Sequence, residues 1–396
     1  MRVESIAGLC TEVGYHSLNK HGEELCGDHV AVIRPDEDTL IVVLADGLGS
    51  GVKASILSTL TSGIISTMVA RNMPLEECVS AIAATLPVCS VRGIAYSTFT
   101  ILRIVEGKNA EIVQYDNPKA ILLREGRHRQ FPMEKEIIGG KTIYTSRVSL
   151  EEGDTFVLIT DGVEHAGVGE TLNFGWQYRD IVLYLQGMYK DSYTAKTITA
   201  FLLEQCMLLY AGKPGDDATV CTVKVRKRQR VNLLVGPPQD PEDVHRMMSR
   251  FFGEEGRHIV CGGTSGNLAA QYLGKQLVGG VPTYIDPAIP PTAKIEGVDL
   301  VTEGVITLSK VMDYVRDYAG ENRLYGSWSR SKDGASLVAR FLLEIATDIH
   351  FYVGRAVNPA HQKPDLPFGY STKIHMVEAM VQQLKLVGKH VESSYF

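Results

Sequence analysis

Aspartates stand beside glycines at several points where the chain is expected to leave or enter a buried strand. These points are Gly27-Asp28, Asp46-Gly47, Asp161-Gly162 and Gly215-Asp216-Asp217. Asp46 and Asp161 directly follow the apolar runs LIVVLA and TFVLIT, and the pair Asp216-Asp217 leads into a third apolar run, ATVCTV. Because the ends of such buried strands converge on a shared sheet edge, we expect these carboxylates to lie close together.

Clustered carboxylates repel one another, so a site of this kind is expected to hold hard divalent cations. Mg²⁺ or Mn²⁺ suits oxygen ligands, and no Cys/His set in the sequence competes for zinc or copper. No convincing Ser–His–Asp or Cys–His motif supplies a side-chain nucleophile. The other interpretation is structural, since an Asp-Gly or Gly-Asp step read alone is a common turn signal.

The order of these motifs resembles that of the metal-dependent serine/threonine phosphatases of the PP2C (PPM) superfamily, and among them the bacterial SpoIIE branch. The resemblance covers residues 1–226 and rests on Gly27-Asp28, ADGLGSGVKA at 45–54, Glu152-Gly153-Asp154, TDGVE at 160–164 and DDATV at 216–220. It implies an α+β fold, a four-layer α-β-β-α sandwich. It also implies hydrolysis of phosphoserine or phosphothreonine on a regulatory protein, such as an anti-anti-sigma-like domain, by a water that two Mn²⁺ or Mg²⁺ ions activate.

The resemblance also implies a role for each carboxylate. Asp46 would bridge the two metals, with the Gly47 carbonyl on one of them, and Asp28 would hold metal-bound water on that side. Asp161 and Asp216 would ligate the other metal, with Asp217 as the alternative at the last position. The catalytic water would then be held by Asp28, Asp46 and Asp161.

Some residues depart from the family pattern. Leu48 stands where the eukaryotic branch has a histidine often assigned as general acid, which leaves protonation of the leaving group unassigned. The segment YDNPKA at 115–120 matches the family's Asn-Ala-Gly-His-Pro-like turn only in part. His165 lies near the proposed site, and we interpret it as a polar loop residue rather than as a ligand or acid.

A dinucleotide cradle is the rival interpretation of the strand, glycine loop and helix around residue 47. Gly47, Gly49 and Gly51 have the spacing G-x-G-x-G, whereas the dinucleotide fingerprint has its third small residue one place later, at Val52. No acidic partner for a ribose follows about 20 residues on, where Thr67 stands. The sequence therefore favours the metal interpretation.

Periodicity predicts the elements that would position these residues. A turn at 35–38 is expected to join strands at 29–34 and 39–45. Apolar residues at 56, 57, 60, 64, 65 and 68 predict a helix from Val52 with one buried face. The further expectations are a helix at 75–85, strands near 96–105, 110–116, 142–149 and 155–160, a helix at 194–210, and a strand at 218–225.

A second domain is expected after a basic segment. Residues 224–230 carry five cations in seven residues, and a fresh apolar run, VNLLV, follows. We therefore predict a phosphatase domain at 1–228 and an α/β domain, regulatory or ligand-binding, at 229–396. In the latter, Gly262, Gly263, Thr264 and Ser265 join a strand to a helix, which suits an anion site or a turn capped by Thr264 or Ser265. The helix at 373–388 is expected to face the core.

Composition limits the partners. The 396 residues are 44% hydrophobic and 22% charged, with a net charge of −6, which excludes a disordered chain and a global positive field for nucleic acid or an anionic membrane. Seven dispersed cysteines without C-x-x-C, and no apolar run of membrane length, lead us to expect a cytoplasmic protein. A homodimer and a small-molecule effector at the C-terminal domain stay open. The alternative functions are a catalytically silent signalling scaffold and a phosphatase of a small phosphorylated molecule.

Overall fold

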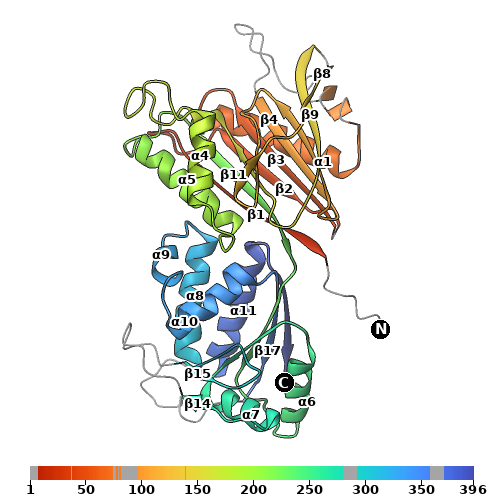
Figure 1. Ribbon diagram of the computed structural model, residues 1–396, viewed down its shortest axis with the longest axis vertical. Helices are drawn as coiled ribbons and strands as arrows, with labels where there is room; N and C mark the ends of the chain where they lie inside the picture. The colour runs from red at the N-terminus through yellow and green to blue at the C-terminus, as the bar shows by residue number, and fades with distance from the viewer. Residues whose placement is uncertain are drawn as a thin grey trace. The chain divides into compact units, whose positions relative to one another are not determined.

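The computed structural model describes residues 8–36, 38–74, 77–78, 80–81, 97–138, 140–279, 292–356 and 370–396. The chain forms two compact units, Met1–Lys227 and Arg228–Phe396, and each has hydrophobic cores of its own (Figure 1). It remains a prediction that residues 1–228 and 229–396 are separate functional domains. The helix expected at 75–85 lies mostly outside the described residues.

The N-terminal unit contains two antiparallel sheets. One has six strands in the order β2 (Asp28–Ile33), β3 (Thr39–Gly47), β4 (Ser97–Val105), β5 (Asn109–Tyr115), β9 (Lys141–Ser149) and β8 (Glu134–Ile138). The other has five, in the order β1 (Leu9–Leu18), β11 (Ala218–Lys227), β10 (Thr155–Ile159), β6 (Ile121–Arg124) and β7 (Arg127–Arg129). The strands predicted at the aspartate motifs are therefore confirmed, and the motifs lie at their ends.

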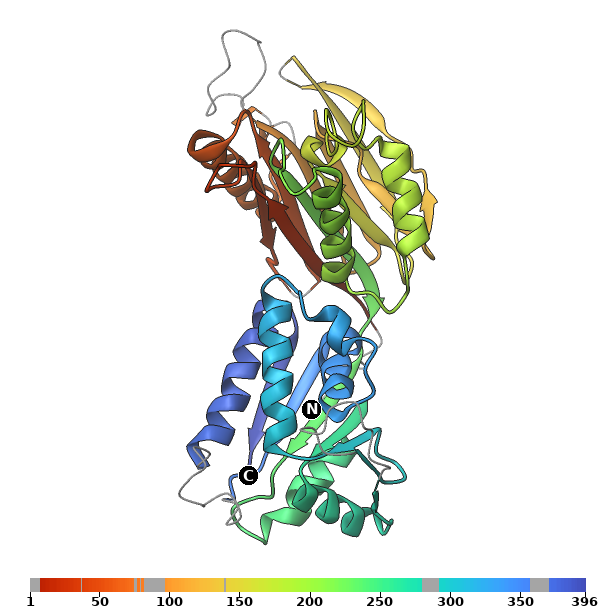
Figure 2. The ribbon, with the colours of Figure 1, turned by 90° about the vertical axis from the view of Figure 1, so that its left-hand side faces the viewer.

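Helices cover the outer faces of both sheets, so the four-layer α-β-β-α prediction is confirmed (Figure 2). Helix α1 (Gly51–Ala70) packs on the six-stranded sheet, while α3 (Asp161–Glu164), α4 (Tyr178–Met188) and α5 (Ala195–Leu209) pack on the five-stranded one. Between the sheets, Leu44 and Leu102 of one meet Phe156 and Val223 of the other. Burial of these alternate side chains holds the two sheets face to face.

The predicted buried face of α1 is confirmed at Ile65, which is buried, and at Leu57 and Ile64, which pack against the core, but it is wrong at two other positions. Ile56 and Leu60 are 54% and 48% exposed, whereas the buried positions include Ala54, Ser58 and Ser62. The serine hydroxyls donate to backbone carbonyls three residues earlier, so burying them leaves no donor unsatisfied. Small residues on this face let the helix backbone approach the sheet closely.

By length and mean hydropathy alone, α1 is the one helix in the described ranges that could cross a membrane. The core helix of a folded domain passes the same test, and α1 packs along β2 and β3. The free cysteines of the described part are Cys10, Cys26, Cys78, Cys206, Cys221 and Cys261.

The C-terminal unit is a doubly wound α/β fold. Its sheet has the order β14 (Val278–Gly279), β15 (Ala293–Lys294), β16 (Leu300–Thr302), β13 (Arg257–Cys261), β12 (Arg230–Val235), β17 (Asp348–Val353) and β18 (His390–Tyr395). The five strands from β16 to β18 are parallel. The chain adds β13 and β16 on one side of β12, and then returns to add β17 and β18 on the other. The strand order therefore reverses between β12 and β17.

Helices cover both faces of this sheet. α6 (Asp243–Gly253) and α7 (Gly263–Leu273) pack on one face. α8 (Val305–Ala319), α10 (Gly334–Arg340) and α11 (Tyr370–Leu386) pack on the other, with α9 (Tyr325–Trp328) and a π-helical turn (Phe341–Ile345) beside them. α11 buries Val377, Met380 and Leu384, as its spacing predicts. Neither Thr264 nor Ser265 caps α7, because its N-cap is Gly262, whose φ of 117° places it in the region that favours glycine.

Candidate metal centre

The strand register brings the aspartates together in pairs. In the six-stranded sheet, Asp28 at the start of β2 lies directly opposite Asp46 near the end of β3. In the five-stranded sheet, Ile159 at the end of β10 pairs with Val220 of β11, so Asp161 and the Asp216-Asp217 pair meet at the same edge. Each sheet thus contributes one group of carboxylates to one cluster.

Asp28 and Asp46 are the inner members of this cluster. Asp28 is buried, and its Oδ2 accepts a hydrogen bond of 2.8 Å from the Thr160 hydroxyl. Burial raises the pKa of Asp28 to about 7, although hydrogen bonds from Thr160 and Thr219 oppose the rise. Burial, followed by the negative charges of Asp28, Asp161 and Asp216, raises the pKa of Asp46 to about 9. These carboxylates therefore lie close enough to destabilise one another's charge.

Asp161 and Asp216 are the outer members, and His165 joins them. One ligand atom from each of the three lies within 4.8 Å of the others. The His165 Nδ1 is 3.9 Å from Asp161 Oδ2 and 4.0 Å from Asp216 Oδ2. The sequence interpretation treats His165 as a loop residue, whereas the structure places it beside both aspartates; its i, i+4 spacing from Asp161 is the sequence signal for this position.

Asp217 faces a different way from Asp216. It is 4% exposed, and its Oδ1 accepts a 2.9 Å hydrogen bond from the Lys20 backbone N–H. Its Oδ2 is buried with no hydrogen-bond partner in the described part of the chain, and lies 2.9 Å from where a Cβ on Gly27 would stand. The structure thus places Asp216 beside Asp161, and Asp217 against the Gly27 turn.

The glycines of the Asp-Gly motifs are needed for close backbone packing. A Cβ on Gly47 would lie 2.2 Å from the Ala54 carbonyl oxygen, in the first turn of α1. A Cβ on Gly162 would lie 1.9 Å from the Asp217 carbonyl oxygen. These distances are too short for any side chain, so only glycine lets the backbone pack this closely at both positions. The close packing holds the backbone in place directly after Asp46 and Asp161.

The donor set suits divalent cations. Its members are the carboxylates of Asp28, Asp46, Asp161, Asp216 and Asp217, with the His165 nitrogen. In the ranges that the structure describes, no Lys or Arg forms an ion pair with any of these aspartates. Raised pKa values and the orphaned Asp217 oxygen mark an excess of negative charge, which hard cations would balance. The residues therefore fit the metals that the sequence predicts.

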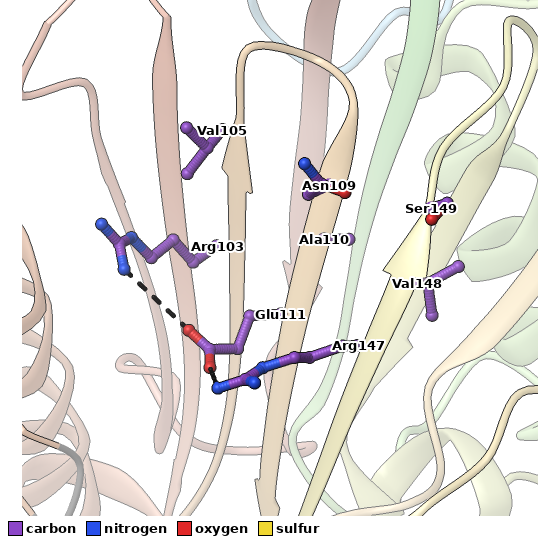
Figure 3. A pocket seen from close by; sticks show the side chains of 8 residues that line it. All are labelled: Arg103, Val105, Asn109, Ala110, Glu111, Arg147, Val148 and Ser149. Atoms are coloured by element: carbon purple, nitrogen blue, oxygen red, sulfur yellow. Dashed lines mark hydrogen bonds and ion pairs between the residues drawn. The ribbon is translucent and has the colours of Figure 1, made fainter.

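A separate cavity lies on the outer face of β4, β5 and β9 (Figure 3). It has a volume of about 320 Å³. Glu111 extends between Arg103 and Arg147, whose guanidinium nitrogens are 4.0 Å and 3.5 Å from its carboxylate oxygens. The charged side chains of the cavity therefore pair with one another. None of the clustered aspartates lines it, and it does not belong to the metal centre.

Part of the chain matches a known protein family. Residues 36–226 match the family described as Stage II sporulation protein E (SpoIIE). Phosphoserine phosphatase RsbX of Bacillus subtilis (strain 168) is 27% identical over 183 residues, which are 45% of this chain and 86% of RsbX. The family match falls on the unit that carries the aspartate cluster.

Solved structures are also similar to this chain, at low sequence identity and with TM-scores below 0.5. The PP2C phosphatase domain of SpoIIE from Bacillus subtilis, with a fragment of its regulatory domain, is 16% identical with a TM-score of 0.49. That match covers 56% of this chain and 65% of the solved one, just under two thirds. RsbX in complex with magnesium is 22% identical, with a TM-score of 0.39, over 57% of this chain and 98% of RsbX. Residues 36–226 thus match the SpoIIE family, and this match together with the similarity to RsbX supports a phosphatase, a hydrolase of phosphoric monoesters.

Proposed function

We propose that the N-terminal unit removes phosphate from phosphoserine or phosphothreonine on a regulatory protein, with two Mn²⁺ or Mg²⁺ ions. The observation that carries this proposal is the cluster of Asp28, Asp46, Asp161 and Asp216 contributed by both sheets. The similarity to a protein named phosphoserine phosphatase supports the substrate. The resemblance of the motifs supports an anti-anti-sigma-like partner.

Asp46 would be shared between the two ions, with the Gly47 carbonyl and Asp28 on one side and Asp161 and Asp216 on the other. When bound, the ions would supply positive charge for the phosphate oxygens and lower the pKa of water toward about 7. Thr160 fixes the Asp28 carboxylate by its hydrogen bond, and the buried Gly47 and Gly162 turns hold the backbone beside Asp46 and Asp161. His165 adds a nitrogen at the outer side.

The exposure of the outer members favours a protein substrate. The side chains of Asp161, His165 and Asp216 are 49%, 55% and 38% exposed. A phosphorylated side chain on another protein's surface can reach these groups without entering an enclosed pocket. We therefore prefer a phosphoprotein to a small phosphorylated molecule as the substrate.

The test is hydrolysis of a serine-phosphorylated protein and of an aryl phosphate, with Mn²⁺ and with EDTA, by wild type, Asp46→Asn and Asp161→Asn. We expect metal-dependent release of phosphate by wild type, and a loss of at least about a hundredfold in both variants. Absence of hydrolysis with any metal would favour the silent scaffold. Activity on small phosphates but on no phosphoprotein would favour the alternative substrate.

A regulatory role is our proposal for the C-terminal unit, with a small-molecule effector as its signal. Its doubly wound sheet supports this role, because folds of this kind commonly bind small ligands at one edge. Comparing phosphatase rates of the full chain with and without candidate effectors tests the proposal. Rates that never respond would point to a separate role for this unit.

A further inference from the structure

Glycines line the carboxyl edge of the parallel sheet in the C-terminal unit. Gly236, Gly262 and Gly354 directly follow β12, β13 and β17, and Gly304 is the second residue after β16. The strand register puts the last residues of these four strands, Val235, Cys261, Val353 and Thr302, side by side. The glycines therefore form a continuous edge, and this is the edge at which doubly wound sheets bind ligands.

The chain itself fills the point where the strand order reverses. The Gly354 N–H donates to the Val235 carbonyl at 2.9 Å, and the Ala356 N–H donates to the Pro237 carbonyl at 3.1 Å. A Cβ on Gly354 would lie 2.0 Å from the Pro237 oxygen. Because the two loops are in direct contact, a ligand is better placed at the neighbouring pair of turns, β13–α7 and β16–α8.

These two turns bring two helix N-termini together. A Cβ on Gly304 would lie 3.5 Å from the Gly262 Cα, and the Gly262 N–H donates to the Thr302 carbonyl at 2.8 Å. Gly262 is the N-cap of α7 and Gly304 that of α8, so neither helix has a capping side chain or an acidic residue in its first turn. Uncapped N–H groups and the positive ends of both helices favour an anion here.

Each of the two helices has a buried hydroxyl at its third position, and these hydroxyls supply an independent observation. Ser265 is 1% exposed and Thr307 is 0% exposed, and neither hydroxyl has a hydrogen-bond partner among the described residues. The Ser265 Oγ lies 3.5 Å from where a Cβ on Gly262 would stand, so it points at the turn. Buried hydroxyls without partners are rare in folded proteins, and a ligand oxygen would satisfy them.

A carboxylate lies beside the same turn. The Glu303 Oε1 is 3.9 Å from where a Cβ on Gly263 would stand. A carboxylate repels phosphate, but it accepts hydrogen bonds from hydroxyl groups such as those of a sugar. Its presence selects a ligand with both a phosphate and neighbouring hydroxyls over a bare anion.

We propose that residues 262–265 and 303–307 bind a small phosphorylated molecule that carries sugar hydroxyls. Its phosphate accepts hydrogen bonds from the first N–H groups of α7 and α8 and from the Ser265 and Thr307 hydroxyls. Glu303 accepts from a sugar hydroxyl. Nucleotides and sugar phosphates share this chemistry, and the binding test separates them.

The test is calorimetric titration of the full chain in EDTA, which keeps phosphate from a metal-loaded phosphatase site. The probes are inorganic phosphate, ribose 5-phosphate, AMP and adenosine. We expect ribose 5-phosphate or AMP to bind at least about tenfold more tightly than inorganic phosphate, and adenosine not to bind. A much higher affinity for AMP than for ribose 5-phosphate would identify the ligand as a nucleotide, and equal affinities would identify it as a sugar phosphate. Failure of both to bind, or binding of adenosine as tight as AMP, overturns the proposal.

Gly263→Asp locates the site. Outside its own helix, Glu303 is the one described residue within 4 Å of the added Cβ, and a carboxylate in the first turn suits the helix while repelling a phosphate. We expect binding to weaken at least about tenfold. Gly326→Asp, at an exposed position in the first turn of α9 with nothing within 4 Å of its Cβ, is the control and should bind like wild type. Unchanged binding by folded Gly263→Asp contradicts the proposal.

Ser265→Ala gives a reading that does not depend on a new charge. The hydroxyl has no hydrogen-bond partner among the described residues to lose, so this variant should fold with wild-type stability while binding AMP or ribose 5-phosphate several-fold more weakly. It decides the matter where Gly263→Asp fails to fold. Wild-type affinity in Ser265→Ala would remove the buried hydroxyl from the site and contradict the proposal.

Discussion

Asp46→Asn should stabilise the metal-free protein while abolishing its activity. Asp46 is the member of the cluster whose pKa is raised most, from 3.8 to about 9, first by burial and then by the charges of Asp28, Asp161 and Asp216. An amide has nearly the same shape and no charge. Replacing the carboxylate therefore removes a repulsion that the fold otherwise tolerates for function.

The size of the effect follows from the shift in pKa. At pH 7, a carboxyl whose pKa is 3.8 in the unfolded chain and about 9 in the folded one costs the folded state up to about 4 kcal/mol. Asp46 is only partly buried, and the cluster shares its repulsion, so protonation of one member relieves the others. We therefore expect Asp46→Asn to recover about 2 kcal/mol, a rise of roughly 5 °C in Tm.

The pH dependence has a definite sign. Between its unfolded and folded pKa values, Asp46 binds more protons in the folded state, so metal-free wild type loses stability as the pH rises from about 4 toward about 9. The stability of Asp46→Asn should therefore depend less steeply on pH than that of wild type. Mn²⁺ should stabilise wild type, because it takes the place of the protons, and should stabilise the variant much less.

Thermal unfolding in EDTA and in Mn²⁺, between pH 5 and pH 8, measures all three effects. Asp191→Asn, at an exposed aspartate of the same unit, is the control for a change of one charge and should differ little from wild type. An Asp46→Asn variant less stable than wild type in EDTA at pH 8, or equally stabilised by Mn²⁺, would refute the reasoning.

His165→Gln should weaken Mn²⁺ binding about tenfold in a calorimetric titration, because it removes the nitrogen beside Asp161 and Asp216; unchanged affinity would return it to a loop role. Gly47→Ala should lower the free energy of unfolding by at least about 3 kcal/mol, because its Cβ would lie 2.2 Å from a backbone oxygen. The control Gly63→Ala, in α1, should be neutral or stabilising. Urea titrations that give both variants the same free energy of unfolding would contradict this prediction. Asp333 caps α10, and although burial favours its protonated form, hydrogen bonds from Ser331 and Ser336 lower its pKa. Asp333→Ala should therefore cost about 1–2 kcal/mol at neutral pH, a loss that shrinks as the pH falls through the lowered pKa; a difference independent of pH would count against it.

Local sequence predicted the strands that carry the metal centre because their apolar runs leave little choice. LIVVLA and TFVLIT are buried along their whole length, and the aspartates that follow them stand at the strand ends for that reason. The Asp-Gly steps were readable as turns, but Gly47 and Gly162 serve close backbone packing, which depends on Ala54 and Asp217 from elsewhere in the chain.

Other features depend on contacts that no local pattern records. The buried face of α1 follows from the sheet beneath it, and the hydroxyls of Ser58 and Ser62 satisfy themselves on the helix backbone. The order of the parallel strands in the C-terminal unit rests on pairings between distant segments, such as Val235 with Val353. The sequence located the turn at 262–265, and the neighbouring turn at Gly304 became visible only in the fold.

The central claim is that carboxylates from both sheets hold two divalent cations. Anomalous diffraction from a crystal of the full chain grown with Mn²⁺ tests it most directly. We predict two anomalous peaks in the cluster, with Asp46 contacting both and with Asp28 and Asp161 on opposite sides. A Mn²⁺-loaded crystal without a peak among Asp28, Asp46, Asp161 and Asp216 would contradict the account.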